Sequence, residues 1–431
     1  MRIRAVVVNY NGGDDIRGCL RALLASEWPA GDLEIVVVDN GSVDGSPEWI
    51  EAELPQVRLF RSPGNLGYPA INQVVDDLTG VDLVAIVNPD AVVAPDCLAA
   101  LAAALADDNG LAAACPLIVL DGCYRDVCID AEGLIGASLD LLAVEGGGRW
   151  HLTGPNVHRR WRGGVAWSIG HGSVLRTTAT APVTLRVRGQ RTGRLALSSG
   201  GERVEVAVRR SPFVARITPG GAAREIVQNA GSVIGARGVG INRGYHVPDG
   251  PAFSEPVDVP AWCGAAVLLR SDYLRDTGLF DPRWFLYYED TDLAWRGLLR
   301  GWRYRYVPGA KVRHAHSTTI GHGSALYDVQ HLRNRLLTVT KCAPAGEVVA
   351  AWADVLGLVG RQLRSDLVAR VVRDRRLPEP VMSGRWLRAL AAAARLTPGV
   401  LRDRRSVRRG ATVADDALPV LGRWHDAMGA S

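Results

Sequence analysis

Short apolar runs alternate with amphipathic segments through the first hundred residues of the chain. A continuous apolar run such as residues 5–8 is typical of a parallel strand covered on both faces. Residues 15–24 instead place apolar side chains at helical spacing on one face. The strands that the pattern predicts are residues 5–8, 34–38, 57–60 and 83–87. This alternation predicts a doubly wound α/β fold, in which ligands bind beyond the carboxyl ends of the strands of a parallel sheet.

Two later parts of the chain follow other patterns. Residues 183–188 and 204–208 alternate apolar and polar side chains between glycine-rich turns, so we expect a small inserted antiparallel β-sandwich. Near the C-terminus apolar residues return to helical spacing among many arginines, which predicts a basic amphipathic helical segment. The expected domains are the N-terminal part of the α/β domain (1–144), the inserted β-domain (145–225), the C-terminal part of the α/β domain (226–343) and a helical tail (344–431).

Polar and glycine residues occupy the loops after the predicted strands. Asp39 ends the second strand in a turn of small polar residues that could meet a base or a ribose. Gly64–Tyr68 follows the third strand, where glycines let backbone N–H groups approach a ligand closely. Asn88-Pro89-Asp90 follows the fourth and offers a carboxylate to a divalent cation. Each signal is weak alone, because such residues are common in turns.

The order of these loops is more informative than any one of them. Together they resemble the family 2 glycosyltransferases of the GT-A fold, and most closely the bacterial rhamnosyltransferase-like members. The resemblance covers about residues 1–120 and 225–343. The segments that carry it are Val-Val-Asn-Tyr-Asn (7–11), Val-Val-Asp-Asn-Gly-Ser (37–42), Gly-Asn-Leu-Gly-Tyr (64–68), Asn-Pro-Asp (88–90), Trp262–Ala266, Gly278–Asp281, Tyr287–Arg296 and His314–Ser317.

The resemblance implies an inverting transfer of a sugar from a nucleotide diphosphate donor to a hydroxyl of a glycan or lipid-linked acceptor. Asp290, with Glu289 beside it, matches the family's catalytic base. Read without the resemblance, these acids stabilise the first turn of a helix, and Asp292 orients or caps it. The residues implied at the nucleotide sugar are Asn9, Asp39, Asn65, Asn88, Asp90 and Arg333. Those implied at the acceptor are Trp262, Cys263 and Gly264.

The resemblance also implies a metal cofactor. Asp90 and His314 are expected to hold Mg²⁺ or Mn²⁺ against the diphosphate, because oxygen ligands suit magnesium and imidazole favours manganese. His316 is the alternative ligand. Asn88 stands where many family members carry an aspartate, so we expect a loosely held cation until the donor adds its oxygens. Arg333 has the spacing of a Gln-x-x-Arg element beside the donor in processive relatives, although a solvated helix arginine fits equally well.

The composition is that of a globular enzyme. The chain has 431 residues, of which 47% are hydrophobic and 22% charged, with a formal net charge of +5. Its seven cysteines form no CxxC pair, which indicates reduced thiols and a cytoplasmic protein. No apolar segment is long enough to span a bilayer, so any membrane contact is expected to be peripheral, at the inner face.

Arginine is concentrated in the insertion and the tail. Residues 149–216 include thirteen arginines and two acidic residues. This excess of positive charge could bind an anionic glycan or a lipid diphosphate, or could only keep the domain solvated. The basic tail fits either anionic membrane lipid or a contact within a homo-oligomer. No nucleic-acid partner is expected, because neither aromatic platforms nor a recognition helix accompany the arginines.

Two other classes of function compete with this hypothesis. A catalytically inert, GT-A-like sugar-binding module would share the fold, but the presence of Asp90, Asp290 and His314 favours an enzyme. A nucleotide-dependent oxidoreductase needs a Gly-x-Gly-x-x-Gly turn after the first strand, where this chain has Asn9-Tyr10-Asn11-Gly12-Gly13. The sequence does not identify the donor sugar, the acceptor or the linkage.

Overall fold

The computed structural model describes residues 1–29, 31–132, 139–146, 148–155, 157–160, 166–315, 324–367 and 381–419. The chain forms two compact units. The main unit contains residues 1–119, 227–245 and the described part of 250–431. The inserted unit contains residues 120–226 and 246–249.

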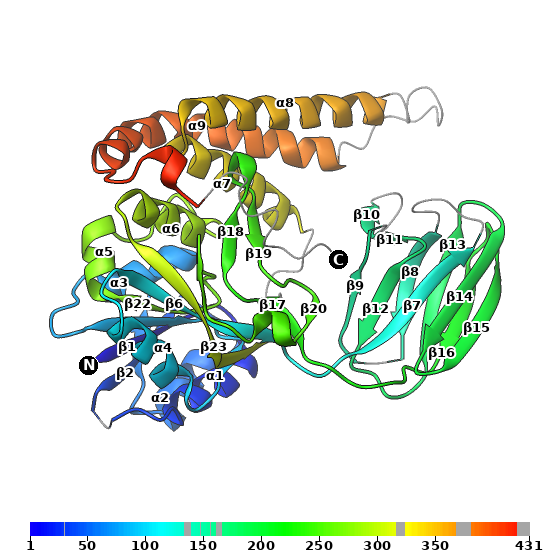
Figure 1. Cartoon of the computed structure of the whole chain (residues 1–431), viewed down its shortest axis with the longest axis horizontal. Coiled ribbons are helices and arrows are strands. Elements are labelled where there is room, and N and C mark those ends of the chain that lie inside the picture. The colour runs from blue at the N-terminus through cyan, green and yellow to red at the C-terminus, as the bar shows by residue number, and fades with distance from the viewer. Residues whose placement is uncertain are drawn as a thin grey trace. The chain divides into compact units, whose positions relative to one another are not determined.

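The main unit is built on a mixed sheet (Figure 1). Its parallel half has the order β4-β1-β2-β3, with all neighbours parallel. These strands are β1 (Ile3–Asn9), β2 (Leu33–Asp39), β3 (Arg58–Arg61) and β4 (Leu83–Val87). All four predicted strands are therefore confirmed. The register pairs Asn9 with Asp39, so the loops after β1 and β2 begin side by side.

The other half of the sheet is antiparallel. Next to β4 lies β22, followed by β6 and β17, and each of these neighbours is antiparallel. These strands are β6 (Leu111–Leu120), β17 (Ile226–Asn229) and β22 (Ala266–Arg270). The parallel sheet was predicted from the first hundred residues, and the antiparallel strands come from later parts of the chain. An apolar run shows that a strand is buried, but the direction in which it joins the sheet depends on where the connecting chain returns.

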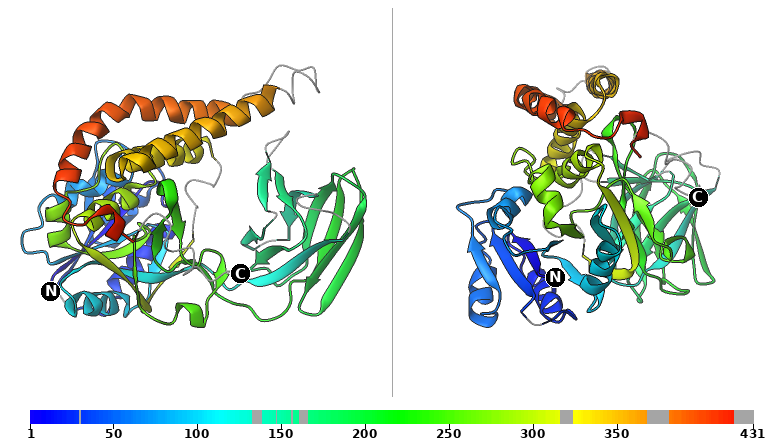
Figure 2. Two further views of the ribbon diagram at one scale, coloured as in Figure 1. Left: turned by 45° about the horizontal axis from the view of Figure 1, so that its top comes forward. Right: turned by 60° about the vertical axis from the view of Figure 1, so that its left-hand side comes forward.

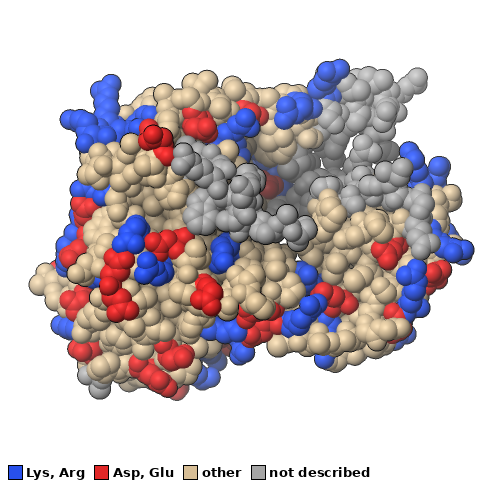
Figure 3. Space-filling model, in the orientation of Figure 1, with Lys and Arg blue, Asp and Glu red and all other residues tan. Residues whose placement is uncertain are grey.

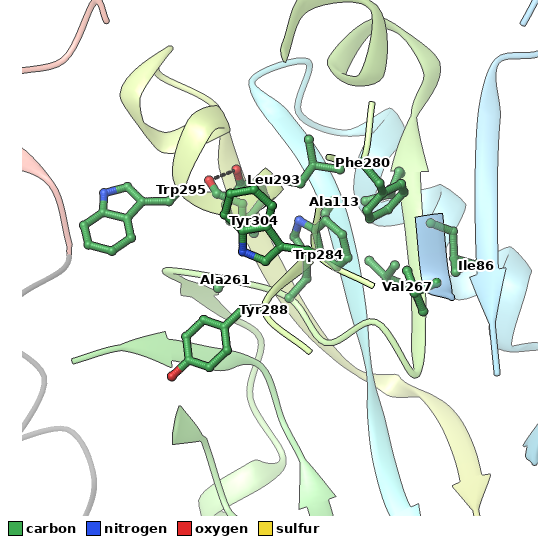
Figure 4. Close-up of a cluster of buried hydrophobic side chains, with 14 of the residues drawn as sticks. Ile86, Ala113, Ala261, Val267, Phe280, Trp284, Tyr288, Leu293, Trp295 and Tyr304 are labelled. Carbon is green, nitrogen blue, oxygen red and sulfur yellow. Dashed lines mark hydrogen bonds between the residues drawn. The ribbon is translucent and has the colours of Figure 1, made fainter. Parts of the chain in front are cut away.

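Apolar side chains cover the sheet on both faces. In β1, Val6 belongs to one buried cluster, whereas Ala5 and Val7 belong to another, because successive side chains of a strand point to opposite faces. Figure 4 shows the cluster that contains Val6 and the aromatic rings of Trp284 and Trp295. The helices that cover the sheet and extend from it are α1 (Asp15–Leu24), α2 (Ser46–Glu53), α3 (Asn72–Val75), α4 (Cys97–Ala106), α5 (Ser271–Thr277), α6 (Glu289–Leu299), α7 (Ala325–Cys342), α8 (Ala345–Leu367) and α9 (Val381–Arg409).

Short elements complete the main unit and its junctions. β23 pairs with β5 at one end and with β21 at the other. The remaining bounds are β5 (Ala91–Val93), β18 (Ser232–Ile234), β19 (Gly240–Asn242), β20 (Val247–Pro248), β21 (Val257–Val259), β23 (Arg303–His314), η1 (Tyr68–Ile71), η2 (Ala236–Gly238), η3 (Pro251–Phe253) and η5 (Asp415–Ala417).

The inserted unit consists of two antiparallel sheets, with the orders β10-β11-β8-β13-β16 and β15-β14-β7-β12-β9. Their inward side chains form one apolar cluster, in which Ile129 and Leu197 of one sheet join Leu141 and Leu185 of the other. The predicted small antiparallel β-sandwich is thus confirmed. Its strands are β7 (Arg125–Glu132), β8 (Leu139–Glu145), β9 (Trp150–Thr153), β10 (His158–Arg160), β11 (Ala166–Ile169), β12 (Ser173–Thr177), β13 (Val183–Gly189), β14 (Gly193–Ser199), β15 (Glu202–Val208) and β16 (Phe213–Ile217).

The inserted unit begins at residue 120, not at residue 145 as the sequence pattern predicted. The missed stretch contains β7, whose Asp126 accepts hydrogen bonds from Arg176 at 3.0 Å and Arg224 at 2.9 Å. In β8, Asp140 is 3.3 Å from Arg188. Carboxylates of the missed stretch therefore neutralise part of the arginine excess that the sequence assigned to the insertion.

The helical tail is part of the main unit and not a separate domain. Arg404 donates hydrogen bonds to the carbonyls of Thr340 and Ala343, and Arg408 donates to that of Cys342. These two tail arginines thus satisfy carbonyls at the C-terminal end of α7, which lack partners within the helix. Within the ranges that the structure describes, no helix is long and apolar enough to cross a membrane.

Candidate active site

The loops after β1 and β2 are held together by a buried polar network. Asn9 donates through Nδ2 to Asp39 Oδ1 at 2.9 Å and to Ser46 Oγ at 2.8 Å. Asp39 Oδ2 accepts the backbone N–H groups of Gly41 and Ser42, each at 3.1 Å. Asn9 and Asp39 are both buried. The structure therefore brings these two predicted residues together as supports of the loops at the strand ends.

The Gly64–Tyr68 loop is also shaped by internal hydrogen bonds. Asn65 Oδ1 accepts the N–H of Gly67 at 3.0 Å, and Asn40 donates to the carbonyl of Gly67 at 2.9 Å. Gly67 has a positive φ of 70°, and a Cβ there would lie 1.9 Å from the carbonyl oxygen of Phe285. Only glycine, which has no Cβ, allows the two backbone segments to lie this close together. The loop is thereby joined to the segment that precedes α6.

A hollow of about 290 Å³ opens between the loop after β1 and the loop after β4. It is lined by Asn11–Asp15 and by Pro89 and Asp90. Its volume is at the lower end of the range for small-molecule sites, and its place beyond the carboxyl ends of adjacent parallel strands is where α/β sheets bind ligands.

Asp90, at the edge of this hollow, faces His314 at the end of β23. His314 Nε2 is 2.9 Å from Asp90 Oδ1 and 3.4 Å from Asn88 Nδ2. Antiparallel pairing of β23 with β5 sets His314 opposite Ala91, the neighbour of Asp90. The side chains of His314 and Asp90 are only 5% and 10% exposed. Two predicted metal ligands that are 224 residues apart in sequence are therefore adjacent.

Gln228 on β17 orients the imidazole. Its Oε1 is 2.7 Å from His314 Nδ1, so Nδ1 carries the proton and donates it. The lone pair of Nε2 then faces the carboxylate of Asp90, and two acceptors at this distance need a proton or a cation between them.

The donor set fits a divalent cation that takes further oxygens from a ligand. Among the described residues no group of three or more His, Cys, Asp or Glu side chains could hold a metal. Asp90 offers one carboxylate and His314 one imidazole. A cation held by these two ligands would keep coordination positions for phosphate oxygens. His316, the alternative ligand, lies outside the described residues.

Asp290, in the first turn of α6, is held by backbone donors. Its Oδ2 accepts the N–H of Gly264 at 3.0 Å, and its Oδ1 accepts the N–H of Thr291 at 2.6 Å. The carbonyl of Gly264 accepts a hydrogen bond from Tyr68 at 2.7 Å. A Cβ at residue 264 would lie 2.8 Å from the Tyr68 hydroxyl. Glycine is therefore required between the side chains of Tyr68 and Asp290.

The two adjacent carboxyl groups of α6 have different electrostatic environments. Burial raises the pKa of Asp290, and hydrogen bonds from Gly264 and Thr291 oppose this rise. Burial, followed by the charge of Asp290, raises the pKa of Glu289 well above its usual value. Glu289 Oε2 is buried and has no hydrogen-bond partner among the residues that the structure describes. Burial thus raises the pKa of both neighbouring carboxyl groups at the start of α6, which favours proton uptake there.

The backbone before α6 is strained. Tyr287 and Tyr288 both have a φ of 68°, in the left-handed region that side chains disfavour. Asn334 of α7, fully buried, donates to the carbonyls of Leu286 at 2.9 Å and Tyr287 at 2.7 Å. Asn334 thus fixes the turn that delivers Glu289 and Asp290. The sequence analysis missed it, because nothing local marks a helix asparagine as the clamp of a distant turn.

Arg333, the neighbour of Asn334, forms hydrogen bonds within its own surroundings. It donates to the carbonyl of Arg283 at 2.9 Å and to Asn334 Oδ1 at 2.8 Å. Burial, together with the charge of Arg395, lowers its pKa. Arg333 is therefore not the solvated helix arginine of the alternative hypothesis, and its predicted role at the diphosphate stays a prediction.

The residues expected at the acceptor differ in accessibility. Trp262 is fully buried and packs edge-on against Phe280, with ring centroids 6.2 Å apart. Burial, followed by the charge of Asp290, raises the pKa of the Cys263 thiol to about 12. Of the three, Gly264 alone has a hydrogen bond to Asp290 in the described structure. The structure makes Trp262 a core residue, and the signal of its motif is explained by packing.

Asp292 has the supporting role that the sequence suggested. It is fully buried and lies 2.9 Å from Arg296 and 3.0 Å from Lys341. Lys341 also lies 2.8 Å from Asp281. This buried ion network joins α6 to α7 two residues after Asp290.

The fold and the site together have the features of the GT-A fold. A parallel half-sheet with polar loops at its carboxyl ends is combined with a carboxylate–imidazole pair and a half-buried carboxylate in α6. Residues 5–132 match the family model for glycosyl transferase family 2.

Two curated relatives are similar to this chain. An uncharacterized glycosyltransferase, YibD of Escherichia coli (strain K12), is 29% identical over 163 residues, which are 37% of this chain and 45% of the relative. The N-acetylglucosaminyl-diphospho-decaprenol L-rhamnosyltransferase of Mycobacterium tuberculosis (strain CDC 1551 / Oshkosh) is 25% identical over 330 residues, which are 73% of this chain and 76% of the relative.

Solved structures are more distant. GalNAc-T7 with UDP, GalNAc and Mn²⁺ matches with a TM-score of 0.45 and 14% identity, over 79% of this chain and 48% of that chain. The mannosyltransferase PcManGT from Pyrobaculum calidifontis, in complex with GDP-Man and Mn²⁺, gives 0.38 and 14%, over 94% of this chain and 73% of that chain. With scores this low, the fold assignment rests on the sheet topology and the family match.

Proposed function

We propose that this chain is an inverting glycosyltransferase that moves a sugar from a nucleotide diphosphate donor to a hydroxyl of a glycan or lipid-linked acceptor. The observation that carries the proposal is the environment of Asp290. Two backbone N–H groups hold this half-buried carboxylate in place, and burial raises its pKa, which strengthens it as a proton acceptor. Such an arrangement suits a general base.

In the proposed reaction, Asp290 takes a proton from the acceptor while one bond to the sugar forms and another breaks. The acceptor hydroxyl gives its proton to Asp290 Oδ2, which has a second lone pair besides the one that accepts from Gly264. The freed oxygen attacks the anomeric carbon from the face opposite the diphosphate. The bond from that carbon to the diphosphate oxygen breaks, and the nucleoside diphosphate leaves with both electrons, so the configuration is inverted.

Asp90 and His314 are proposed to bind the diphosphate end of the donor through Mg²⁺ or Mn²⁺. A bound cation supplies positive charge that stabilises the leaving diphosphate. Gln228 keeps the lone pair of His314 Nε2 directed at the cation position, and Asn88 lies at its edge. The adjoining hollow is proposed to receive the nucleotide, with Asn9, Asp39 and Asn65 shaping its loops.

The sugar and acceptor classes follow from the mycobacterial relative. Its alignment covers 73% of this chain, and its name specifies an L-rhamnosyl donor and a lipid diphosphate acceptor. We therefore favour a rhamnose-like donor and a lipid-linked or glycan acceptor, with a cytoplasmic enzyme that touches the inner membrane face. The product would belong to a cell-envelope polysaccharide.

The test measures hydrolysis and transfer from a panel of nucleotide sugars in the presence of Mg²⁺ or Mn²⁺. We expect Asp290→Asn to lower the turnover rate by about 10²–10⁴-fold with nearly unchanged donor affinity, because the amide cannot accept the proton. The matched control is Asp272→Asn, an exposed aspartate of α5, which should keep full activity. Near-normal turnover of Asp290→Asn excludes the proposed base. Donor binding without turnover in the unaltered protein supports the inert sugar-binding module instead.

A further inference from the structure

Helix α8 exposes a row of large apolar side chains. Val349, Leu356 and Leu363 have 70%, 55% and 41% of their surface accessible. They are seven residues apart, so they return to nearly the same side of the helix. Single exposed apolar residues are ordinary, but a regular row along one helix indicates a surface that another body covers.

Helix α9 exposes a row of arginines. Those in it are Arg388, Arg395, Arg402, Arg405 and Arg409. Four of them follow at intervals of seven, two before and two after Pro398, which lies inside the helix. None of the five is ion-paired within the part of the chain that the structure describes. Asp403, the sole acid in the sequence of α9, is bonded to Arg283.

The two rows belong to neighbouring helices. α8 and α9 lie side by side and both contact α7, as the views of Figures 1 and 2 show. Glu347 and Asp354, the acids of α8 whose side chains are described, both bond to Arg237 of the main unit. In Figure 3, Lys and Arg side chains gather at both ends of this helical layer. The layer thus combines exposed apolar and basic side chains, while its described acids are engaged elsewhere.

We propose that the α8–α9 layer docks on an anionic lipid bilayer, with the apolar row of α8 in the interfacial zone and the arginines of α9 against lipid phosphates. Interfacial helices have this combination of apolar and basic residues. The inference adds to the proposed function, on which it rests for its purpose of bringing the donor site to a lipid-linked acceptor. A second copy of the chain is a weaker candidate, because the unpaired arginines of two copies would repel each other.

The experiment is sedimentation of the full chain with vesicles of phosphatidylglycerol and phosphatidylcholine, compared with vesicles of phosphatidylcholine alone. We expect binding to the mixed vesicles only, and release as salt screens the charges. Each arginine near an anionic surface contributes about a five-fold factor in partitioning. The triple variant Arg388→Gln, Arg402→Gln, Arg409→Gln should therefore bind on the order of 100-fold more weakly.

A matched control removes the same charge from the inserted unit, through Arg186→Gln, Arg191→Gln and Arg209→Gln, all at exposed positions. An equal loss of binding in this control, or binding of the unaltered chain to neutral vesicles alone, overturns the proposal. A dimer in light scattering that Val349→Asn with Leu356→Asn abolishes makes the face a contact between copies, which also overturns it.

A separate assay distinguishes this inference from the proposed function. Donor hydrolysis in vesicle-free buffer should be unchanged in the α9 triple variant, because its residues lie outside the described contacts of Asp90, His314 and Asp290. Hydrolysis that is absent from every protein tested counts against the proposed function alone, while the vesicle result still decides the docking.

Discussion

Replacement of Lys341 by methionine tests whether the buried ion network holds α6 on α7. Lys341 Nζ is 2.8 Å from Asp281 and 3.0 Å from Asp292, and the lysine side chain is 5% exposed. Methionine keeps an unbranched side chain of similar length and removes the charge. Asp281 keeps Arg283 and Asp292 keeps Arg296, so each carboxylate loses one of two cationic partners.

The size of the effect can be worked from Asp281. Burial alone would raise its pKa, but hydrogen bonds from Arg283 and the charge of Lys341 outweigh burial and lower the pKa from 3.8 to about 2. At 1.36 kcal/mol per pKa unit, this shift is worth about 2 kcal/mol at neutral pH. Removal of one partner from a buried ion pair costs about 3–5 kcal/mol, and the retained arginines favour the lower end. We therefore expect Lys341→Met to lower the free energy of unfolding by about 3 kcal/mol.

The assay is urea-induced unfolding, followed by tryptophan fluorescence at several pH values. Because the folded pKa of Asp281 is depressed, its contribution is present above pH 3.8 and is lost as the pH falls toward about 2. The difference in unfolding free energy between variant and unaltered protein should therefore narrow as the pH falls through that acid interval. Lys311→Met, at the one other lysine of the chain, is the control and should cost less than about 1 kcal/mol. A loss below about 1 kcal/mol for Lys341→Met at neutral pH would refute the reasoning.

Two further predictions concern the metal position. Excess chelator should abolish donor hydrolysis, and Asp90→Asn should raise the Mn²⁺ concentration needed for half-maximal hydrolysis; full activity in chelator would contradict the metal role. Gln228→Leu should weaken Mn²⁺ activation about 10–100-fold by releasing His314, whereas Gln228→Glu keeps an acceptor for Nδ1 and should be less impaired; equal Mn²⁺ titrations for both variants would show that Gln228 does not orient the imidazole.

Local patterns predicted the parallel half of the sheet and the loops that carry the site. A buried parallel strand requires a continuous apolar run, and a loop at its end requires turn residues, so both are written in neighbouring positions of the chain. Asp90 could be selected in this way because it follows the fourth strand, whereas Asp290 was selected by the family resemblance of its motif. The β-sandwich was likewise visible in the alternation of 183–188 and 204–208.

Tertiary structure alone decided which distant residues complete the site. Gln228 lies within hydrogen-bonding distance of His314, 86 positions away in sequence. Asn334 of α7 donates a hydrogen bond to the carbonyl of Tyr287, before α6. Neither has a local signature, because a hydrogen bond between remote elements leaves no periodicity along the chain. The antiparallel direction of β22 and the start of the inserted unit at residue 120 were hidden for the same reason. An apolar run specifies burial, whereas its partner and direction are set by the packing of the whole sheet.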